Sequence, residues 1–381
     1  MFYILFKGIS PNTASGNRFL SFLRGFDELC IDGTAVLLMP SEGHYRIQEK
    51  YHHLRVKYLW RDWPFCRKVL DWIYRQSVFG RFKSLLKEGD IVFCYGSPEY
   101  LADLMTVKGV RVFHERTESP EVLPLSSSNA QHRYLDACKQ LDGLFVITTA
   151  LKSYFESKGI PPERISIINI TVDNKRFDCL TKTPGAENYI AYCGNASNNK
   201  DGVDELIKAF FLVRKKHGDI KLYIIGKAPS KVDESGNIKL IQSLGLKENV
   251  VFTGMVKADK MPQLLKDAMI LALDRPDSLQ AQNGFPTKLG EYLMTENPVV
   301  ATKVGDIPNF LKDGESALLA EQRNPEDFAS KLCWALEHPV ESSIIGKKGK
   351  EVAMKEFNYL IESKKIVDAI GIMRNQTGFK C

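Results

Sequence analysis

Residues 283–303 read NGFPTKLGEYLMTENPVVATK and predict one helix-to-strand step of a parallel β-sheet. A glycine- and proline-containing turn leads into a predicted helix, with Thr287 as its N-cap and apolar residues at helical spacing over 288–295. A proline ends this helix, and residues 299–302 are typical of a short buried parallel strand. The stretch therefore predicts a doubly wound α/β domain.

Polar groups in the same stretch indicate a ligand site. In doubly wound sheets, ligands bind beyond the carboxyl ends of the strands, where the free N–H groups of helix starts favour anions. The turn at 284–287 is thus a candidate phosphate site, and the carboxylate of Glu291 could accept two hydrogen bonds from a diol such as a ribose. A helix start with one surface glutamate explains the same residues equally well.

Length and composition are those of an ordinary globular protein. The 381 residues suffice for two domains, and 44% hydrophobic with 26% charged residues excludes a disordered or fibrous class. The apolar run before Lys7 is too short for a signal-peptide core. No apolar run approaches the roughly 18 residues of a membrane-spanning helix. We therefore expect a cytoplasmic protein.

The eight cysteines form no CxxC pair. Several of them fall in predicted strands or helices, a pattern that indicates reduced core thiols. We expect neither a zinc site nor a disulfide framework, and no metal in the active site.

The opening stretch resembles the nucleotide-sugar signature of glycosyltransferase family 4, which consists of retaining enzymes with the GT-B fold. That signature places two glutamates eight positions apart around a Phe-Gly or Phe-Pro turn. The second glutamate corresponds to Glu291 and the aromatic residue to Phe285, whereas Asn283 replaces the first glutamate. Asparagine keeps hydrogen-bonding capacity but removes a negative charge beside the reacting carbon. The resemblance implies an α/β GT-B fold with two Rossmann-like doubly wound domains facing a central cleft.

A second loop, NASNNKDG at 195–202, resembles the family's donor-diphosphate loop. Lys200 matches the family's lysine before glycine, and Asn195 replaces the usual basic residue. Since the departing nucleoside diphosphate gains charge, an ammonium here stabilises the transition state more than the ground state. Lys227, Arg275 or Lys288 could substitute for the missing charge, and an ordinary exposed loop lysine is the alternative for Lys200.

The first half of the chain offers two further candidates. Residues 8–17 form a small-residue loop containing Gly16 between a predicted strand and helix, and the similarly placed loop of GT-B enzymes implies a site near phosphate or acceptor. A plain connection is the alternative, because no GxGxxG spacing is present. His114 ends a predicted strand in a polar cluster and matches a histidine that lies near the donor sugar in relatives. A structural histidine is the alternative.

Residues 46–87 combine eleven basic and three acidic residues with interleaved aromatic side chains. The pattern fits a solvated pair of outer helices, and it also fits an anionic membrane surface. Nucleic acid is a weaker alternative, since no recognised nucleic-acid module accompanies the patch. We expect no nucleic-acid partner.

These observations lead to one set of expectations. Residues 1–178 form an N-terminal acceptor-side domain, 179–356 a C-terminal nucleotide-sugar domain, and a helix within 357–381 packs back on the first. The expected catalytic residues are Lys200, His114 and Glu291. The expected donor-binding residues are Gly16, Asn195, Lys227, Met255, Val256, Asn283, Gly284, Phe285, Pro286, Thr287 and Lys288.

The resemblance implies a retaining, metal-independent and cofactor-free transfer of a sugar from a nucleotide diphosphate sugar to a saccharide or lipid-linked acceptor hydroxyl. Polysaccharide or glycolipid synthesis, in the cytoplasm or on the inner face of its membrane, is the expected setting. A nucleotide-sugar-binding subunit without turnover and a GT-B nucleotide-sugar epimerase are the alternatives.

Overall fold

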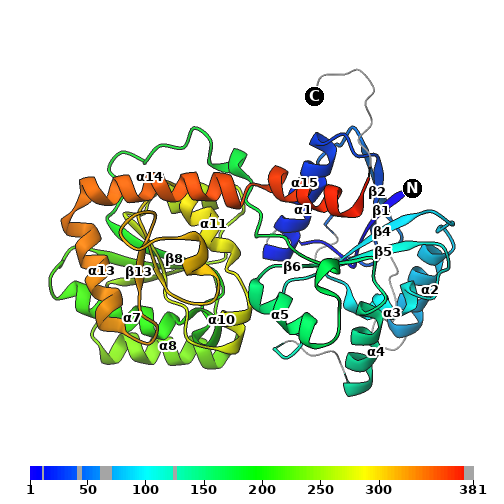
Figure 1. Cartoon of the computed structure of the whole chain (residues 1–381). Helices are drawn as coiled ribbons and strands as arrows, with labels where there is room; N and C mark the ends of the chain where they lie inside the picture. Colours follow the sequence, from blue (N-terminus) through cyan, green and yellow to red (C-terminus); the bar gives the residue numbers. More distant parts are fainter. Residues whose placement is uncertain (11–12, 41–44, 61–70, 123–126, 373–381) are drawn as a thin grey trace. The chain divides into compact units, whose positions relative to one another are not determined.

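The computed structural model describes residues 1–10, 13–40, 45–60, 71–122 and 127–372, with the backbone alone for 71–74. The chain divides into two compact units (Figure 1). One comprises Met1–Asn169 with Tyr359–Cys381, and the other comprises Ile170–Asn358. From the sequence we predicted a domain boundary after residue 178 and a helix within 357–381 that packs back on the first domain.

The N-terminal unit is built on a parallel sheet with the strand order β3-β2-β1-β4-β5-β6-β7 in its described part. The strands are β1 (Phe2–Phe6), β2 (Gly33–Leu37), β3 (Leu54–Tyr58), β4 (Ile91–Tyr95), β5 (Arg111–Arg116), β6 (Gly143–Val146) and β7 (Ile165–Ile167). The helices are α1 (Ala14–Glu28), α2 (Asp71–Lys83), α3 (Leu101–Leu104), α4 (Ser128–Cys138), α5 (Thr149–Ser157) and α15 (Tyr359–Ile370), with 3-10 turns η2 (Pro98–Tyr100) and η3 (Pro162–Arg164).

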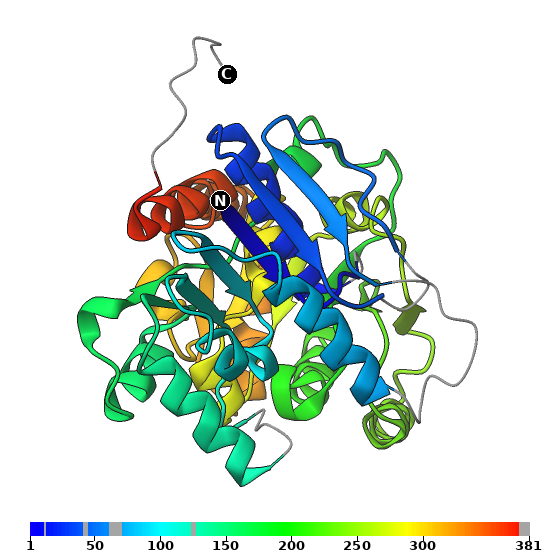
Figure 2. The same cartoon turned by 90° about the vertical axis from the view of Figure 1, so that its right-hand side faces the viewer.

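Aromatic side chains form the core on one face of this sheet. Phe19, Phe22 and Phe26 lie on the buried side of α1 because they recur at helical spacing, and they pack against Phe93 and other strand residues. Helix α15, red in Figures 1 and 2, lies beside α1 and adds Ile366 to the same core. The terminal helix is therefore an integral layer of this unit.

The part of the basic aromatic segment that the structure describes differs from the predicted helix pair. Residues 54–58 form the edge strand β3, paired in parallel with β2, because apolar and charged side chains alternate with the period of a strand. Arg46 stacks on Tyr58 and Trp60, with 4.7 Å between its guanidinium carbon and the Trp60 ring. Trp60 is 5% exposed, so it is not a surface anchor. Residues 61–70 of the segment lie outside the described residues.

The C-terminal unit contains the second parallel sheet, with the order β10-β9-β8-β11-β12-β13. The strands are β8 (Tyr189–Cys193), β9 (Lys221–Ile225), β10 (Val250–Gly254), β11 (Ile270–Leu273), β12 (Val299–Thr302) and β13 (Leu318–Ala320). The helical elements are η4 (Asn174–Phe177), α6 (Asn198–Asp201), α7 (Val203–Arg214), α8 (Lys231–Ser243), α9 (Met261–Asp267), α10 (Leu279–Asn283), α11 (Thr287–Met294), α12 (Ile307–Phe310), α13 (Pro325–Glu337) and α14 (Pro339–Glu356).

The opening stretch forms the predicted helix-to-strand step, with one correction at its start. Thr287 is the first residue of α11, and Pro286 occupies the N-cap position without a side-chain cap. The prediction of Thr287 as N-cap was therefore wrong by one position. Proline is compatible with this place because it lacks the N–H that a helix start leaves unpaired.

Two chain-wide expectations can be compared with the structure. None of the helices in the described residues is long and apolar enough to cross a membrane. Five described cysteines are free, namely Cys94, Cys138, Cys179, Cys193 and Cys333. Cys30 is disulfide-bonded, so the expectation of reduced thiols alone was wrong at that residue.

Candidate functional site

The strand order of the C-terminal unit defines where its ligand site lies. From β8 the chain moves outward to β9 and β10 on one side, and it then returns to β11, β12 and β13 on the other. The reversal occurs between β8 and β11, and doubly wound sheets bind ligands beyond the carboxyl ends of the strands at such a point. The loops after these two strands, 194–202 and 274–286, therefore form the candidate site.

A buried ion pair joins these loops to helix α11. Lys288 donates to Asp201 over 2.5 Å and lies 3.0 Å from the hydroxyl of Tyr192. The Tyr192 hydroxyl lies 2.7 Å from the same carboxylate and 2.6 Å from the carbonyl of Asn195. The side chains of Lys288 and Asp201 are 15% and 4% exposed, so water screens their attraction poorly. This cluster holds the loop at 195–202 against helix α11.

Burial and pairing together shift the pKa of both groups. Burial by itself would raise the pKa of Asp201, but the Lys288 ammonium and the hydroxyl of Tyr192 outweigh it and lower the pKa below its usual value. Burial lowers the pKa of Lys288, and the Asp201 carboxylate opposes that shift. The positive charge of Lys288 is thus already neutralised inside the protein.

Arg275 is a second internal connection between the loops. Its side chain is buried, and its guanidinium donates to the carbonyl of Gly284 over 3.0 Å and approaches the carbonyl of Lys200 at 3.5 Å. Its amide donates to the Thr302 hydroxyl at the end of β12. Because carbonyl groups of two loops share this guanidinium, Arg275 holds the Lys200 and Gly284 loops together.

Close backbone contacts complete the edge of the sheet. Gly226 adopts a φ of +128°, and a Cβ there would lie 2.1 Å from the carbonyl oxygen of Gly194. The amide of Ala196 donates to the carbonyl of Lys227 over 3.0 Å. Glycine is therefore required where the loops after β8 and β9 meet. The same contacts bring the exposed Lys227 beside the Asn195 loop.

The structure distinguishes the three cations that could replace the charge missing at Asn195. Lys288 is paired with Asp201, and Arg275 is buried against carbonyl groups. Lys227 is exposed, and no ion pair involves it among the described residues. Lys200 is half-buried in α6, whose first turn is capped by the Ser197 hydroxyl. Of the three possible replacements, Lys227 is therefore the one that is exposed at this edge.

Glu291 is oriented by an arginine that the sequence reading missed. Arg176 of η4 donates to Oε1 of Glu291 over 2.6 Å and to the carbonyl of Ala258 over 3.0 Å. Among the described residues, Oε1 is the carboxylate oxygen that has a hydrogen-bond partner. Oε2 is thus open to a further donor. Arg176 lies just before the predicted domain boundary at residue 178, and no local pattern predicts that it reaches Glu291.

The other predicted donor residues take varied positions. Phe285 is buried in an aromatic cluster, with ring centroids 5.4 Å from both Phe310 and Phe357, and so it supports the turn by packing. Met255 is exposed beyond β10, and Val256 next to it is half-buried. The remaining three, Asn283, Pro286 and Thr287, lie at the end of α10 or the start of α11.

His114 and Gly16 belong to the N-terminal unit. His114 is fully buried, with Nδ1 2.9 Å from the carbonyl of Cys94 and Nε2 3.2 Å from the hydroxyl of Tyr134. A carbonyl only accepts, so Nδ1 carries the proton and Nε2 accepts from tyrosine. A Cβ on Gly16 would lie 1.9 Å from the carbonyl oxygen of Ser10. Both residues therefore have structural reasons for their identity, and no group of His114 is exposed to a ligand.

The predicted polar cluster around His114 includes a buried ion pair. Glu115 accepts from Arg18 over 2.7 Å, and the same guanidinium donates to the carbonyls of Ile168 and Asn169. Burial raises the pKa of Glu115, and the Arg18 guanidinium opposes that shift. The pair connects α1 to β5 and to the segment after β7.

The state of His114 predicts a pH dependence. Burial lowers its pKa from 6.5 to about 3. Between these values the unfolded chain binds a proton that the folded chain does not, so the free energy of unfolding falls as pH decreases. We expect this one group to contribute a slope of about 1.4 kcal/mol per pH unit. Urea denaturation from pH 7 to 4 should show a shallower slope for His114→Gln. Equal slopes in both proteins would contradict the assignment.

Asp274 is another residue of this edge that sequence reasoning missed. Burial, together with Glu205 and Asp204, raises the pKa of Asp274 well above its usual value. Its carbonyl oxygen would lie 2.1 Å from a Cβ on Gly202. Its place directly after the apolar strand β11 was the available signal.

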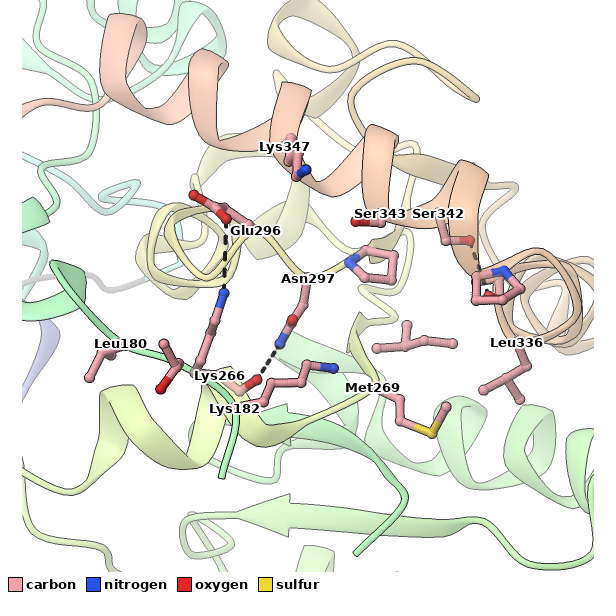
Figure 3. A pocket seen from close by; sticks show the side chains of 15 residues that line it. Leu180, Lys182, Lys266, Met269, Glu296, Asn297, Leu336, Ser342, Ser343 and Lys347 are labelled. Carbon is pink, nitrogen blue, oxygen red and sulfur yellow. Dashed lines mark hydrogen bonds and ion pairs between the residues drawn. The ribbon is translucent and has the colours of Figure 1, made fainter. Parts of the chain in front are cut away.

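A cavity of about 510 Å³ in the same unit lies away from this edge (Figure 3). Its lining includes Met269 and Pro298, which directly precede β11 and β12, so it lies at the amino ends of the strands. Lys182 and Lys266 line it too. Burial lowers the pKa of Lys182, and the nearby Lys266 ammonium adds to the effect. The cavity is thus distinct from the candidate site.

Comparisons with known proteins agree with this description. Residues 187–338 match the family model Glycosyl transferases group 1. An uncharacterized glycosyltransferase of Methanocaldococcus jannaschii is 27% identical over 157 residues, 40% of this chain and 40% of the relative. A GDP-mannose-dependent alpha-(1-6)-phosphatidylinositol monomannoside mannosyltransferase of Mycolicibacterium smegmatis is 23% identical over 313 residues, 77% and 80% of the two chains. The chain thus spans less than half of the archaeal relative.

The structural comparison extends over both units. HepE of Anabaena, solved in complex with UDP-glucose, matches with a TM-score of 0.74 and 16% identity over 97% of this chain and 99% of that chain. Two parallel-sheet Rossmann-like domains with this likeness define the GT-B fold. Within the C-terminal unit, residues 187–338 are those that match the Glycosyl transferases group 1 model. The predicted fold of two Rossmann-like doubly wound domains is confirmed. The match of 187–338 agrees with the predicted glycosyltransferase, while membership of family 4 stays a prediction.

Proposed function

We propose that this protein is a glycosyltransferase that moves a sugar from a nucleotide diphosphate sugar to an acceptor hydroxyl. The observation that carries the proposal is the junction made by Arg275 and the Asp201–Lys288 pair. This junction brings the Lys200 loop, the Gly284 turn and the start of α11 together at the carboxyl ends of β8 and β11, where the strand order reverses. The names of the relatives, which include a GDP-mannose-dependent mannosyltransferase, support the same reaction class.

In this proposal the diphosphate binds between the Lys200 loop and the start of α11. The first N–H groups of α11 have no helical partner and favour an anion, and Lys200 and Lys227 supply positive charge. As the bond to the sugar breaks, the leaving diphosphate gains negative charge. Lys200 then stabilises the transition state more than the bound donor.

The ribose is assigned to Glu291. Arg176 holds Oε1 over 2.6 Å, which limits the rotation of the carboxylate and directs Oε2 away from the arginine. Two ribose hydroxyls could then donate to this carboxylate, with Arg176 as the positioning residue. Base recognition is assigned to main-chain groups near Met255 and Val256, which leaves the identity of the base open to experiment.

Retention and metal independence are part of the same proposal. The acceptor oxygen attacks the anomeric carbon on the face from which the diphosphate leaves, and a diphosphate oxygen takes the hydroxyl proton. The sugar–oxygen bond to the diphosphate breaks as the new glycosidic bond forms, so the protein supplies no nucleophile. Its residues instead hold the diphosphate and stabilise its charge.

A thermal-shift screen tests the donor site. We expect a nucleoside diphosphate or its sugar, from a panel based on uracil, guanine and adenine, to raise the Tm of the wild type by several degrees. Glu291→Gln keeps the size of the side chain but removes the charge that accepts from a diol. This substitution should raise the Kd for the nucleotide about tenfold or more, because charge-assisted hydrogen bonds to the ribose are lost. Lys239→Ala, at an exposed lysine of α8, is the matched surface control.

Transfer and hydrolysis assays separate the proposal from its alternatives. Sugar transfer to an acceptor supports the proposal. Donor binding without transfer or hydrolysis indicates a nucleotide-sugar-binding subunit, an alternative favoured by the asparagines at 195 and 283. Conversion of the donor sugar without an acceptor indicates an epimerase. If no nucleotide in the panel changes the Tm, the proposed donor site is contradicted.

For the acceptor we propose a saccharide or a lipid-linked saccharide used in cell-surface polysaccharide or glycolipid synthesis. The named acceptor of the mycobacterial relative is a phosphatidylinositol mannoside, which supports a lipid-linked form. Membrane contact through 46–87 is the corresponding proposal for localisation. Salt-sensitive flotation with anionic liposomes supports it, and absence of flotation contradicts it.

A further inference from the structure

Helices α7 and α13 lie side by side in the C-terminal unit (Figure 1). Three side chains of metal-ligating type come together near the C-terminal ends of these two helices. Cys333 and Glu337 are four residues apart on α13, which places them on one face of that helix. His217 follows the end of α7. The thiol, one carboxylate oxygen and one imidazole nitrogen all lie within 4.8 Å of one another.

The spacing of these atoms fits a small metal ion. Nε2 of His217 lies 3.2 Å from Oε1 of Glu337. Zinc binds nitrogen and oxygen at about 2.0–2.2 Å, and tetrahedral angles then place two such ligands about 3.4 Å apart. A sulfur ligand at about 2.3 Å requires a separation only slightly larger. The three donor atoms, all within 4.8 Å of one another, therefore need only a small side-chain movement to reach these separations.

The three ligand types also suit zinc chemically. Thiolate, imidazole and carboxylate are each ordinary zinc ligands, and three protein ligands leave a fourth position for water. Cys333 is buried, His217 is half-buried and Glu337 is exposed, so an ion can enter from the solvent side. Binding of the metal would release the thiol proton to solvent.

We propose that His217, Cys333 and Glu337 bind one zinc ion, or a similar divalent transition metal, and that this ion joins the end of α7 to α13. Helix α7 has 12 residues and is about 18 Å long. It begins beside the Lys200 loop and ends at this cluster, so the ion is held at the edge of the sheet opposite the candidate donor site. Its role is to stabilise the unit, and no step of the transfer reaction involves it.

Cobalt titration of the full-length protein under reducing conditions tests the site. Co²⁺ replaces zinc in such sites, and its bond to a thiolate gives a near-ultraviolet charge-transfer band. We expect this band to saturate at one ion per chain and to disappear in Cys333→Ser. His217→Ala and Glu337→Gln should weaken Co²⁺ binding at least tenfold. Cys179→Ser, which removes an exposed cysteine elsewhere in the unit, is the matched control and should titrate like the wild type.

Thermal denaturation provides the second measurement. Addition of Zn²⁺ should raise the Tm of the wild type and of Cys179→Ser by a few degrees, and it should leave the Tm of Cys333→Ser unchanged. Circular dichroism of each variant confirms that it is folded before titration. A charge-transfer band of equal intensity in wild type and folded Cys333→Ser would overturn the proposal. Absence of any band in the wild type would do the same, and it would leave the contact of Nε2 of His217 with Oε1 of Glu337 as a simple polar contact.

Discussion

Lys200→Ala is expected to lower kcat for sugar transfer about 100- to 1,000-fold while changing the KM for the donor only a few-fold. The charge of Lys200 is proposed to act on the leaving diphosphate, so its loss affects the transition state more than the bound donor. The fold should persist, because main-chain contacts of Lys200 connect its loop to the rest of the unit and the substitution keeps them. Its amide donates to the Ser197 hydroxyl, and its carbonyl faces Arg275. Initial rates at saturating donor measure the effect.

Lys239→Ala controls for a general loss of positive charge. Lys239 is exposed on α8, and its removal should leave kcat within twofold of the wild type. Circular dichroism and the Tm of Lys200→Ala test whether the variant remains folded. A folded Lys200→Ala protein that transfers sugar at the wild-type rate would remove Lys200 from the proposed mechanism.

Lys288→Met is expected to lower the free energy of unfolding by about 3–5 kcal/mol. Methionine fills a similar volume but leaves the buried carboxylate of Asp201 without its cation, and removal of one partner from a buried ion pair has an effect of this size. The hydroxyl of Tyr192 remains as a hydrogen-bond partner of Asp201, so we expect a loss near the lower end of this range. Urea denaturation at pH 7 measures the change.

The double variant Asp201→Asn with Lys288→Met distinguishes the ion pair from simple packing. Removing both charges should recover part of the stability lost in the single variant, and the difference is the coupling energy. Acid pH provides a further test. The folded-state pKa of Asp201 is lowered, so its contribution is present above the unfolded value of about 3.9 and is lost as pH falls below it. A single variant less than 1 kcal/mol below wild type would contradict the pairing.

The sequence predicted the fold well where apolar strands alternate with helices. The strand at 299–302 was expected with the bounds that the structure gives, because a short buried run bounded by polar residues has few other interpretations. The prediction failed at β3, where the charged and aromatic residues were read as a helix although their alternation has the period of a strand.

The candidate site was predictable only in its local parts. The segments containing Lys200 and Glu291 could be predicted as parts of a ligand site, because each follows a predicted strand or turn at the start of a helix. The partners of these loops do not, because Arg176 lies 115 residues from Glu291 and Lys288 lies 87 residues from Asp201. A single sequence contains no signal for such pairs. The prediction of His114 as a catalytic residue overlooked its burial for a related reason. The polar residues at the end of its strand do not reveal that β4 and α4 enclose the imidazole.

In the proposed donor site, Asn195 is a position whose side chain can change without altering the loop. Tyr192 reaches the main-chain carbonyl of Asn195, so the path of the loop does not depend on which side chain stands there. Arginine could return to this position, or another polar residue could replace the amide, while the loop kept its shape. Divergence in donor preference could therefore proceed one substitution at a time, without passing through misfolded ancestors.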